Sequence, residues 1–120
     1  MAGLLTLYRP VGPEELKLIE QAGWNAFPPR LPEQPIFYPV TNEAYATKIA
    51  RDWNTRHGSK QGFVTRFNVD ADYVSRFELQ IVGGREHEEL WVPAEELPEF
   101  NAHIAGRIEV IASFKEGDAQ

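Results

Sequence analysis

The chain has 120 residues with 42% hydrophobic and 25% charged residues, values ordinary for one globular domain with a single core. It contains no cysteine, which excludes disulfides and cysteine-ligated zinc. Its net charge of -6 argues against nucleic-acid binding through a broad basic face.

We expect a single domain over residues 1–115, followed by a flexible tail at 116–120. The sequence shows no internal repeat, low-complexity tract or interdomain linker. No apolar run approaches the ~20 residues that span a bilayer. A basic region followed by an apolar block is also lacking at the N-terminus, so the prediction is a cytoplasmic protein without a signal peptide or membrane contact.

The first elements are a strand and a helix. Residues 4–8 predict a strand that Pro10 stops. Pro13 suits the first turn of a helix, and the two glutamates after it favour the positive end of the helix dipole. Gly23 is expected to close that helix.

A proline-rich segment follows at residues 27–39. Its five prolines exclude a helix and allow at most a short central strand. The prolines also lower the entropy lost on ordering, so we predict a fixed loop. Arg30, its only cation, is predicted to line a pocket together with Glu33 and Gln34.

A second helix is predicted after this segment. Thr41 or Asn42 can cap it, since both side chains accept from backbone N–H groups. Tyr45, Ile49 and Trp53 recur every four residues and predict one apolar stripe buried against a sheet.

The second half of the chain changes to a period of two, which predicts strands. We expect strands at 63–69, 77–81, 87–92 and 108–114, a turn or one-turn helix from 70, a turn at 83–84 and a short helix over 94–103. This order favours an α+β fold with a twisted, largely antiparallel sheet and short helices.

Several chemistries lack their motifs. His87 is not followed by a second histidine one helical turn later, because Trp91 stands there, and the other two histidines fall in unrelated segments. No metal site is therefore predicted. The two glycines at 83–84 lack the spacing of a phosphate loop, and no Gly-x-Ser-x-Gly elbow is present.

Carboxylates remain as candidate catalytic groups. Alternation along a strand places Glu89 on one face with His87 and Trp91, and places Glu86 and Glu88 on the other. An aromatic-flanked glutamate suits a cleft. The alternative is a solvent-facing acidic edge strand.

Three polar residues in distant segments could act together. Arg9 and Glu89 each lie on a predicted strand, and Thr41 lies at a strand-helix corner. A guanidinium suits a phosphate, and a carboxylate would stabilise a forming sugar cation, so the set could grip a dinucleotide. The alternative is that all three are surface polar residues of a small mixed fold.

A local basic group is the remaining cluster. Its members are either a small basic patch or a solvated face: Arg51, Arg56, His57, Lys60 and Arg66.

The chain resembles a known fold family through three segments. Leu7-Tyr8-Arg9 is similar to the first-strand arginine motif of Arg-Ser-Glu ADP-ribosyltransferases. Residues 36–41 with the following Ala44 to Ala46 resemble the second motif, and Glu89 to Pro93 the third. Over nearly its whole length the chain resembles small bacterial proteins commonly labelled "ADP-ribosylation/crystallin J1".

The resemblance implies an ADP-ribosyltransferase-like split sheet with NAD bound in its cleft. Arg9 would hold an NAD phosphate or ribose, and Thr41 would support the nicotinamide ribose. Tyr38 or Tyr45 would stack on nicotinamide. Glu89 would contact the ribose 2'-hydroxyl and stabilise the oxocarbenium ion as nicotinamide leaves.

His87 stands where the family has a glutamine or glutamate that helps to choose the acceptor, and we place it at the NAD site. Of the family's Ser-Thr-Ser motif only Thr41 offers a hydroxyl. The implied protein binds NAD or ADP-ribose and is an ADP-ribosyltransferase or NAD glycohydrolase, with an unknown acceptor that could be a protein. The alternatives are a non-catalytic regulatory module and an RNA-processing phosphotransferase, against which the acidic charge counts.

Overall fold

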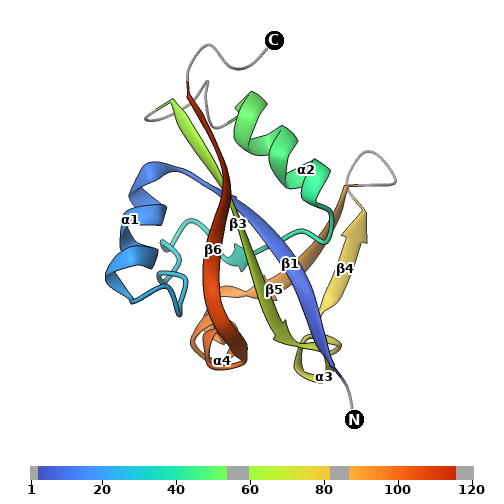
Figure 1. Ribbon diagram of the computed structural model, residues 1–120. Helices are drawn as coiled ribbons and strands as arrows, with labels where there is room; N and C mark the ends of the chain where they lie inside the picture. Colours follow the sequence, from blue (N-terminus) through green and yellow to red (C-terminus); the bar gives the residue numbers. More distant parts are fainter. Residues whose placement is uncertain (1–2, 54–59, 82–86, 116–120) are drawn as a thin grey trace.

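Figure 1 shows the computed structural model, which describes residues 3–53, 60–81 and 87–115. Its strands are β1 (Leu4–Val11), β2 (Ile36–Phe37), β3 (Gln61–Asp70), β4 (Glu78–Ile81), β5 (Glu88–Pro93) and β6 (Ile104–Lys115). Its helices are α1 (Pro13–Gln21), α2 (Glu43–Lys48) with a π-helical extension (Ile49–Trp53), α3 (Ala71–Val74), and a 3-10 turn (Ala94–Glu96) leading into α4 (Leu97–Ala102). None of these helices is long and apolar enough to cross a membrane.

The strands form two antiparallel sheets, so the predicted α+β class with largely antiparallel pairing is confirmed. The first sheet has the order β1-β3-β6 and the second has the order β2-β5-β4. In Figure 1, β1, β3 and β6 run side by side. Helix α1, on the left of the view, contacts β1 and β3, and α2 lies near the upper end of the sheet.

Val40 joins the two sheets. It forms an antiparallel bridge with Tyr8 of β1 and another with Glu89 of β5. Its backbone N–H donates to the Tyr8 carbonyl at 2.7 Å, and the N–H of Leu90 donates to the carbonyl of Pro39 at 2.8 Å. The segment that leads into α2 therefore lies between a strand of each sheet.

The main core lies between the sheets and is rich in aromatic rings. Leu7 and Val11 of β1 and Leu90 and Val92 of β5 contribute their inward faces to it. Four fully buried or nearly buried phenylalanines pack against them: Phe27, Phe37, Phe67 and Phe100.

Pro10 does not end the first strand as predicted, because β1 continues to Val11. The backbone N–H of Tyr8 points away from β3, toward Val40. Pro10 follows two positions later, so its nitrogen also lies on the side away from β3, where the missing N–H removes no ladder hydrogen bond.

The predicted apolar stripe of the second helix is wrong in detail. Tyr45 and Ile49 are only half-buried, and the fully buried positions are Ala46 and Ala50. These small residues let the helix pack closely against the sheet through Val64 and its neighbours. The Trp53 side chain lies outside the described part of the structure.

Most other predicted elements occur with shifted ends. The one-turn helix α3 forms with Asp70 as its cap, and the proline-rich segment contains only the two-residue strand β2. The last strand begins at Ile104 rather than 108, and α4 is preceded by a 3-10 turn. The predicted turn at 83–84 and the predicted tail lie outside the described residues.

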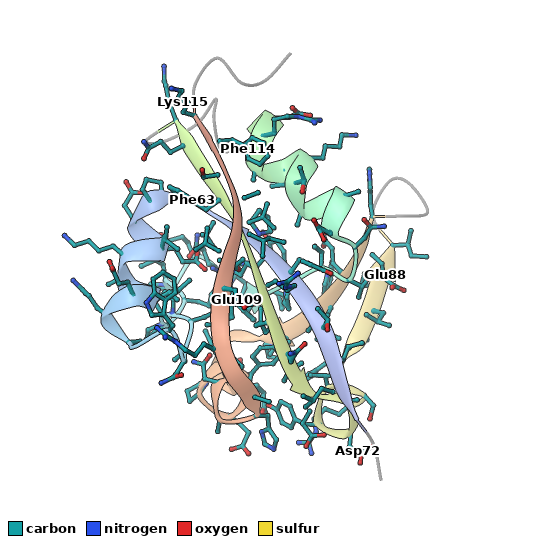
Figure 2. All side chains as sticks on the ribbon, in the orientation of Figure 1. Phe63, Asp72, Glu88, Glu109, Phe114 and Lys115 are labelled. Carbon is teal, nitrogen blue, oxygen red and sulfur yellow. The ribbon has the colours of Figure 1, made fainter. Side chains whose placement is uncertain are left out.

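The basic group is at least in part a set of ion pairs. Arg51 lies 2.9 Å from an Asp52 oxygen, and Arg66 lies 3.0 Å from Glu109 of β6. Figure 2 labels Glu109 on the outer surface of that strand. Residues 56 and 57 are outside the described ranges.

Candidate functional site

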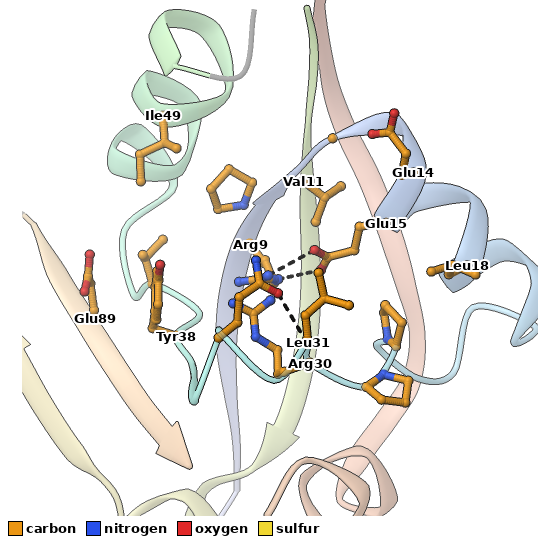
Figure 3. Close-up of a pocket in the computed structure, with 16 residues that line it drawn as sticks. Arg9, Val11, Glu14, Glu15, Leu18, Arg30, Leu31, Tyr38, Ile49 and Glu89 are labelled. Carbon is orange, nitrogen blue, oxygen red and sulfur yellow. Dashed lines mark hydrogen bonds and ion pairs between the residues drawn. The ribbon is translucent and has the colours of Figure 1, made fainter. Parts of the chain in front are cut away.

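A pocket of about 460 Å³ opens between β1, α1, the proline-rich segment and β5, a volume within the usual range for ligand sites. We call it the central pocket (Figure 3). It is lined by Arg9, Pro10, Val11, Gly12, Glu14, Glu15, Leu18, Pro28, Pro29, Arg30, Leu31, Gln34, Tyr38, Val40, Ile49 and Glu89. Arg9 and Glu89 line one pocket as expected, but Thr41, which we expected to act with them, does not line it. Arg30 and Gln34 line the pocket as predicted, and Glu33 does not.

Arg9 lies in the middle of the pocket and is 7% exposed. Its Nε donates to Glu15 Oε2 at 2.6 Å and its Nη2 donates to Glu15 Oε1 at 3.0 Å. Its guanidinium carbon also lies 4.7 Å from the centre of the Phe37 ring. Alternation along β1 turns Arg9 to the same side as Leu7 and Val11, which explains its burial.

Arg30 supplies a second cation to the pocket. Its Nε donates to the carbonyl of Ile36 at 3.2 Å, a hydrogen bond that joins the first half of the proline-rich segment to β2 in its second half. Burial lowers the pKa of Arg30, and the nearby charge of Arg9 lowers it further. The two guanidiniums therefore act on the same region of the pocket.

Glu89 is held by both of its carboxylate oxygens. Tyr45 donates its hydroxyl to Oε2 at 2.7 Å, and the indole N–H of Trp91 donates to Oε1 at 3.1 Å. The side chain is 9% exposed. Because a carboxylate has about four lone-pair sites, each oxygen can still accept a hydrogen bond from a ligand hydroxyl.

Tyr45 contacts Glu89 and does not itself line the pocket. One face of its ring stacks on His87, with centroids 4.4 Å apart and planes 13° from parallel. Burial raises the pKa of Tyr45, and the hydrogen bond to Glu89 adds to this effect. The phenol therefore stays protonated and donating at neutral pH.

The raised pKa of Tyr45 predicts a loss of stability in alkali. Its ordinary value near 10 applies to the unfolded chain, so the unfolded state loses the proton first and the free energy of unfolding falls above about pH 10. Tyr45→Phe should make this fall shallower, as urea unfolding at about pH 8 and about pH 11 would measure. Burial also raises the pKa of Tyr73, so part of the fall should remain. If the free energy of unfolding of Tyr45→Phe fell between these pH values as much as that of the wild type, Tyr45 would not be a source of the pH dependence.

Thr41 takes part in a contact outside the pocket lining. Asn42 is the helix cap, because its side chain accepts from the Tyr45 N–H at 3.1 Å. The Thr41 hydroxyl donates instead to Glu88 Oε1 at 2.9 Å. Glu88 and Glu89 thus have separate partners, as alternation along the strand predicts.

Of the six predicted site residues, three line the pocket, two lie in the contacts of Glu89, and one contacts the adjacent Glu88. Arg9, Glu89 and the 43%-exposed Tyr38 line it. Tyr45 bonds Glu89 directly, His87 stacks on Tyr45, and Thr41 bonds the adjacent Glu88.

Sequence reasoning missed the partner of Arg9 and both hydrogen-bond partners of Glu89, Tyr45 and Trp91. Glu15 follows Arg9 by six residues, but only the corner between β1 and α1 turns the two side chains toward each other. Trp91 had a signal, since it follows Glu89 by two on the same strand face.

The pocket changes character along its length. In Figure 3, Tyr38 and Glu89 lie at one end, Arg9 and Arg30 in the middle, and Leu18 at the other end. Leu18 is 47% exposed, so an apolar surface borders this end of the pocket.

No family model matches the chain, and neither a curated protein nor a solved structure matches it. Among the described residues, no three histidine, aspartate or glutamate side chains gather as a metal site. The functional argument therefore depends on the geometry of the central pocket.

Proposed function

We propose that this protein is an ADP-ribosyltransferase-like domain that binds NAD or ADP-ribose in the central pocket. The observation that carries the proposal is the double pairing of Val40 with Tyr8 and Glu89. That pairing brings the strand arginine and the strand glutamate to one pocket, with Tyr38 beside them. A guanidinium can bind a phosphate of a nicotinamide dinucleotide, an exposed aromatic ring can stack on its base, and an immobilised carboxylate can stabilise a sugar cation.

The order of groups along the pocket supports a dinucleotide as ligand. Nicotinamide and its ribose would lie at the end with Tyr38 and Glu89. The diphosphate would lie at Arg9 and Arg30, since guanidiniums are the preferred donors to phosphate oxygens. The second base would lie on Leu18, whose exposed side chain offers an apolar surface.

The chemistry would be cleavage of the bond between nicotinamide and ribose. Nicotinamide leaves with the bonding electron pair, and positive charge develops on the sugar. The Glu89 carboxylate stabilises that charge while accepting from the ribose 2'-hydroxyl. Water or a hydroxyl, thiol or amine of an acceptor then attacks the sugar carbon and releases its proton to solvent.

Tyr45 and Trp91 are positioning residues in this proposal. Their hydrogen bonds orient both Glu89 oxygens before any ligand arrives. Such preorganisation means that the carboxylate need not reorient as charge develops.

A second candidate function is a binding or regulatory module without catalysis. The observation that favours it is that both carboxylate oxygens of Glu89 already accept hydrogen bonds within the protein, and that the residue is 9% exposed. A carboxylate so engaged could serve to hold the pocket together.

Calorimetric titration with NAD, ADP-ribose and nicotinamide mononucleotide tests the proposal. We expect saturable binding of NAD and ADP-ribose, and weaker binding of the mononucleotide, which lacks the second base. Nicotinamide release from bound NAD would support the enzyme, and binding without release would support the regulatory module. Absence of binding by both NAD and ADP-ribose would reject a nucleotide site.

Arg30→Ala should weaken ADP-ribose binding by about tenfold, or ~1.4 kcal/mol, because one of the two cations for the diphosphate is removed. Arg107→Ala is the matched control, since Arg107 is an exposed arginine on β6 that does not line the pocket. Calorimetry on both variants measures the difference. Equal affinity in the Arg30 variant and the wild type would remove Arg30 from the site.

A further inference from the structure

Glu15 is the counter-ion of Arg9 inside the central pocket. Its two carboxylate oxygens contact Arg9 Nε and Nη2 in a bidentate pair. The Arg9 side chain is 8% exposed and that of Glu15 is 21% exposed. An anion that reaches Arg9 therefore meets a guanidinium that is already paired.

The pair balances charge among three groups. Burial lowers the pKa of Arg30, the charge of Arg9 lowers it further, and the charge of Glu15 raises it. Without Glu15, two cations would share a partly buried region, which is costly unless a partner compensates them.

Glu15 is the more exposed partner of the pair. It stands in the first turn of α1, and its side chain is 21% exposed against 8% for Arg9. Rotation of its side chain toward solvent would release Arg9 without moving β1. The chain thus has a carboxylate placed where a ligand phosphate would bind.

We propose that Glu15 determines which anions the central pocket accepts: it holds Arg9 in the ligand-free protein and yields it to a diphosphate. A single carboxylate or other monoanion gains nothing by replacing Glu15, because it brings the same charge to the same guanidinium. A diphosphate carries enough charge to pair Arg9 and Arg30 together. The inference rests on the proposed function for the identity of the nucleotide, but its test uses inorganic pyrophosphate.

The test compares pyrophosphate binding to wild type, Glu15→Gln and Glu20→Gln by calorimetry. Glu15→Gln should bind pyrophosphate at least about tenfold more tightly, since the competing charge is gone while the side-chain size is kept. Glu20→Gln is the matched control, because Glu20 is an exposed glutamate on the same helix, carries the same charge and does not line the pocket. Its affinity should change by no more than about twofold, since long-range charge alone is screened.

A second variant keeps the inference testable if Glu15→Gln does not fold. Glu15→Asp keeps the charge but moves it away from Arg9, so its pyrophosphate affinity should lie between those of the wild type and Glu15→Gln. Thermal melts add a further readout, in which pyrophosphate should raise the melting temperature of Glu15→Gln more than that of the wild type.

Three results would overturn the inference: unchanged affinity in both Glu15 variants, an equal gain in Glu20→Gln, or no pyrophosphate binding by any of the proteins. The proposed function fails separately. If Glu15→Gln gains pyrophosphate affinity but no protein binds NAD, the anion site stands and the dinucleotide assignment falls. If wild type binds NAD and Glu15→Gln gains no pyrophosphate affinity, the dinucleotide assignment stands and the role of Glu15 falls.

Discussion

Glu89→Gln is expected to lower nicotinamide release from NAD by about 100-fold to 1000-fold while leaving NAD affinity nearly unchanged. Glutamine keeps the size of the side chain and can still contact a ribose hydroxyl, but it cannot stabilise the sugar cation. Its carbonyl can accept from Trp91, and its amide can donate to the Tyr45 oxygen. The local packing should therefore survive, and the change isolates the charge.

Glu88→Gln is the matched control for this experiment. It removes the same charge from the adjacent position, whose carboxylate accepts from Thr41 rather than from Tyr45 or Trp91. We expect less than about a fivefold loss of rate, since charge away from the reacting atoms contributes little. A steady-state assay of nicotinamide release on the three proteins measures both effects. Equal losses would show that position along β5 does not matter, and a wild type that binds NAD without turnover would favour the regulatory module.

Phe100→Ala is expected to cost about 3–5 kcal/mol of the free energy of unfolding. Phe100 is fully buried on α4, and its ring lies 5.3 Å from that of Phe37 and 6.1 Å from that of Phe67. Truncation removes one ring from the aromatic core and leaves a cavity between the sheets. For a domain of this size the loss is a large share of the total stability.

Leu79→Ala provides the contrast. Leu79 is 52% exposed on the outer strand β4, so its truncation should change stability by less than about 0.5–1 kcal/mol. Urea unfolding of both variants gives the two free energies. A Phe100 variant that unfolds at nearly the wild-type midpoint would show that the ring is not part of the stabilising core.

The elements of the fold were largely predictable because their signals are local. Alternation over residues 63–69 gave the two faces of β3, and the prolines of 27–39 limited that segment to the short β2. The predicted apolar stripe of the second helix was wrong because burial on that helix depends on how closely the helix approaches the sheet. Ala46 and Ala50 are buried since small side chains fit against β3, a fact that apolar spacing alone does not encode.

The candidate site was predictable only in its two charged ends. Resemblance and strand context brought Arg9 and Glu89 forward, and both line the pocket. The groups that restrain them were harder to find. Glu15 looked like a favourable helix-end charge, and Tyr45 looked like a core or stacking residue. Their contacts arise from how α1 and α2 pack on the sheets, which is tertiary information.

The joint at Val40 has a kinetic consequence. The site needs pairings of Val40 with residues far away in both chain directions, so we expect these non-local contacts to form late in folding. A ligand held by both Arg9 and Glu89 would then stabilise contacts absent from the folding transition state. It would prolong the lifetime of the folded protein by slowing unfolding, and it would leave the folding rate almost unchanged.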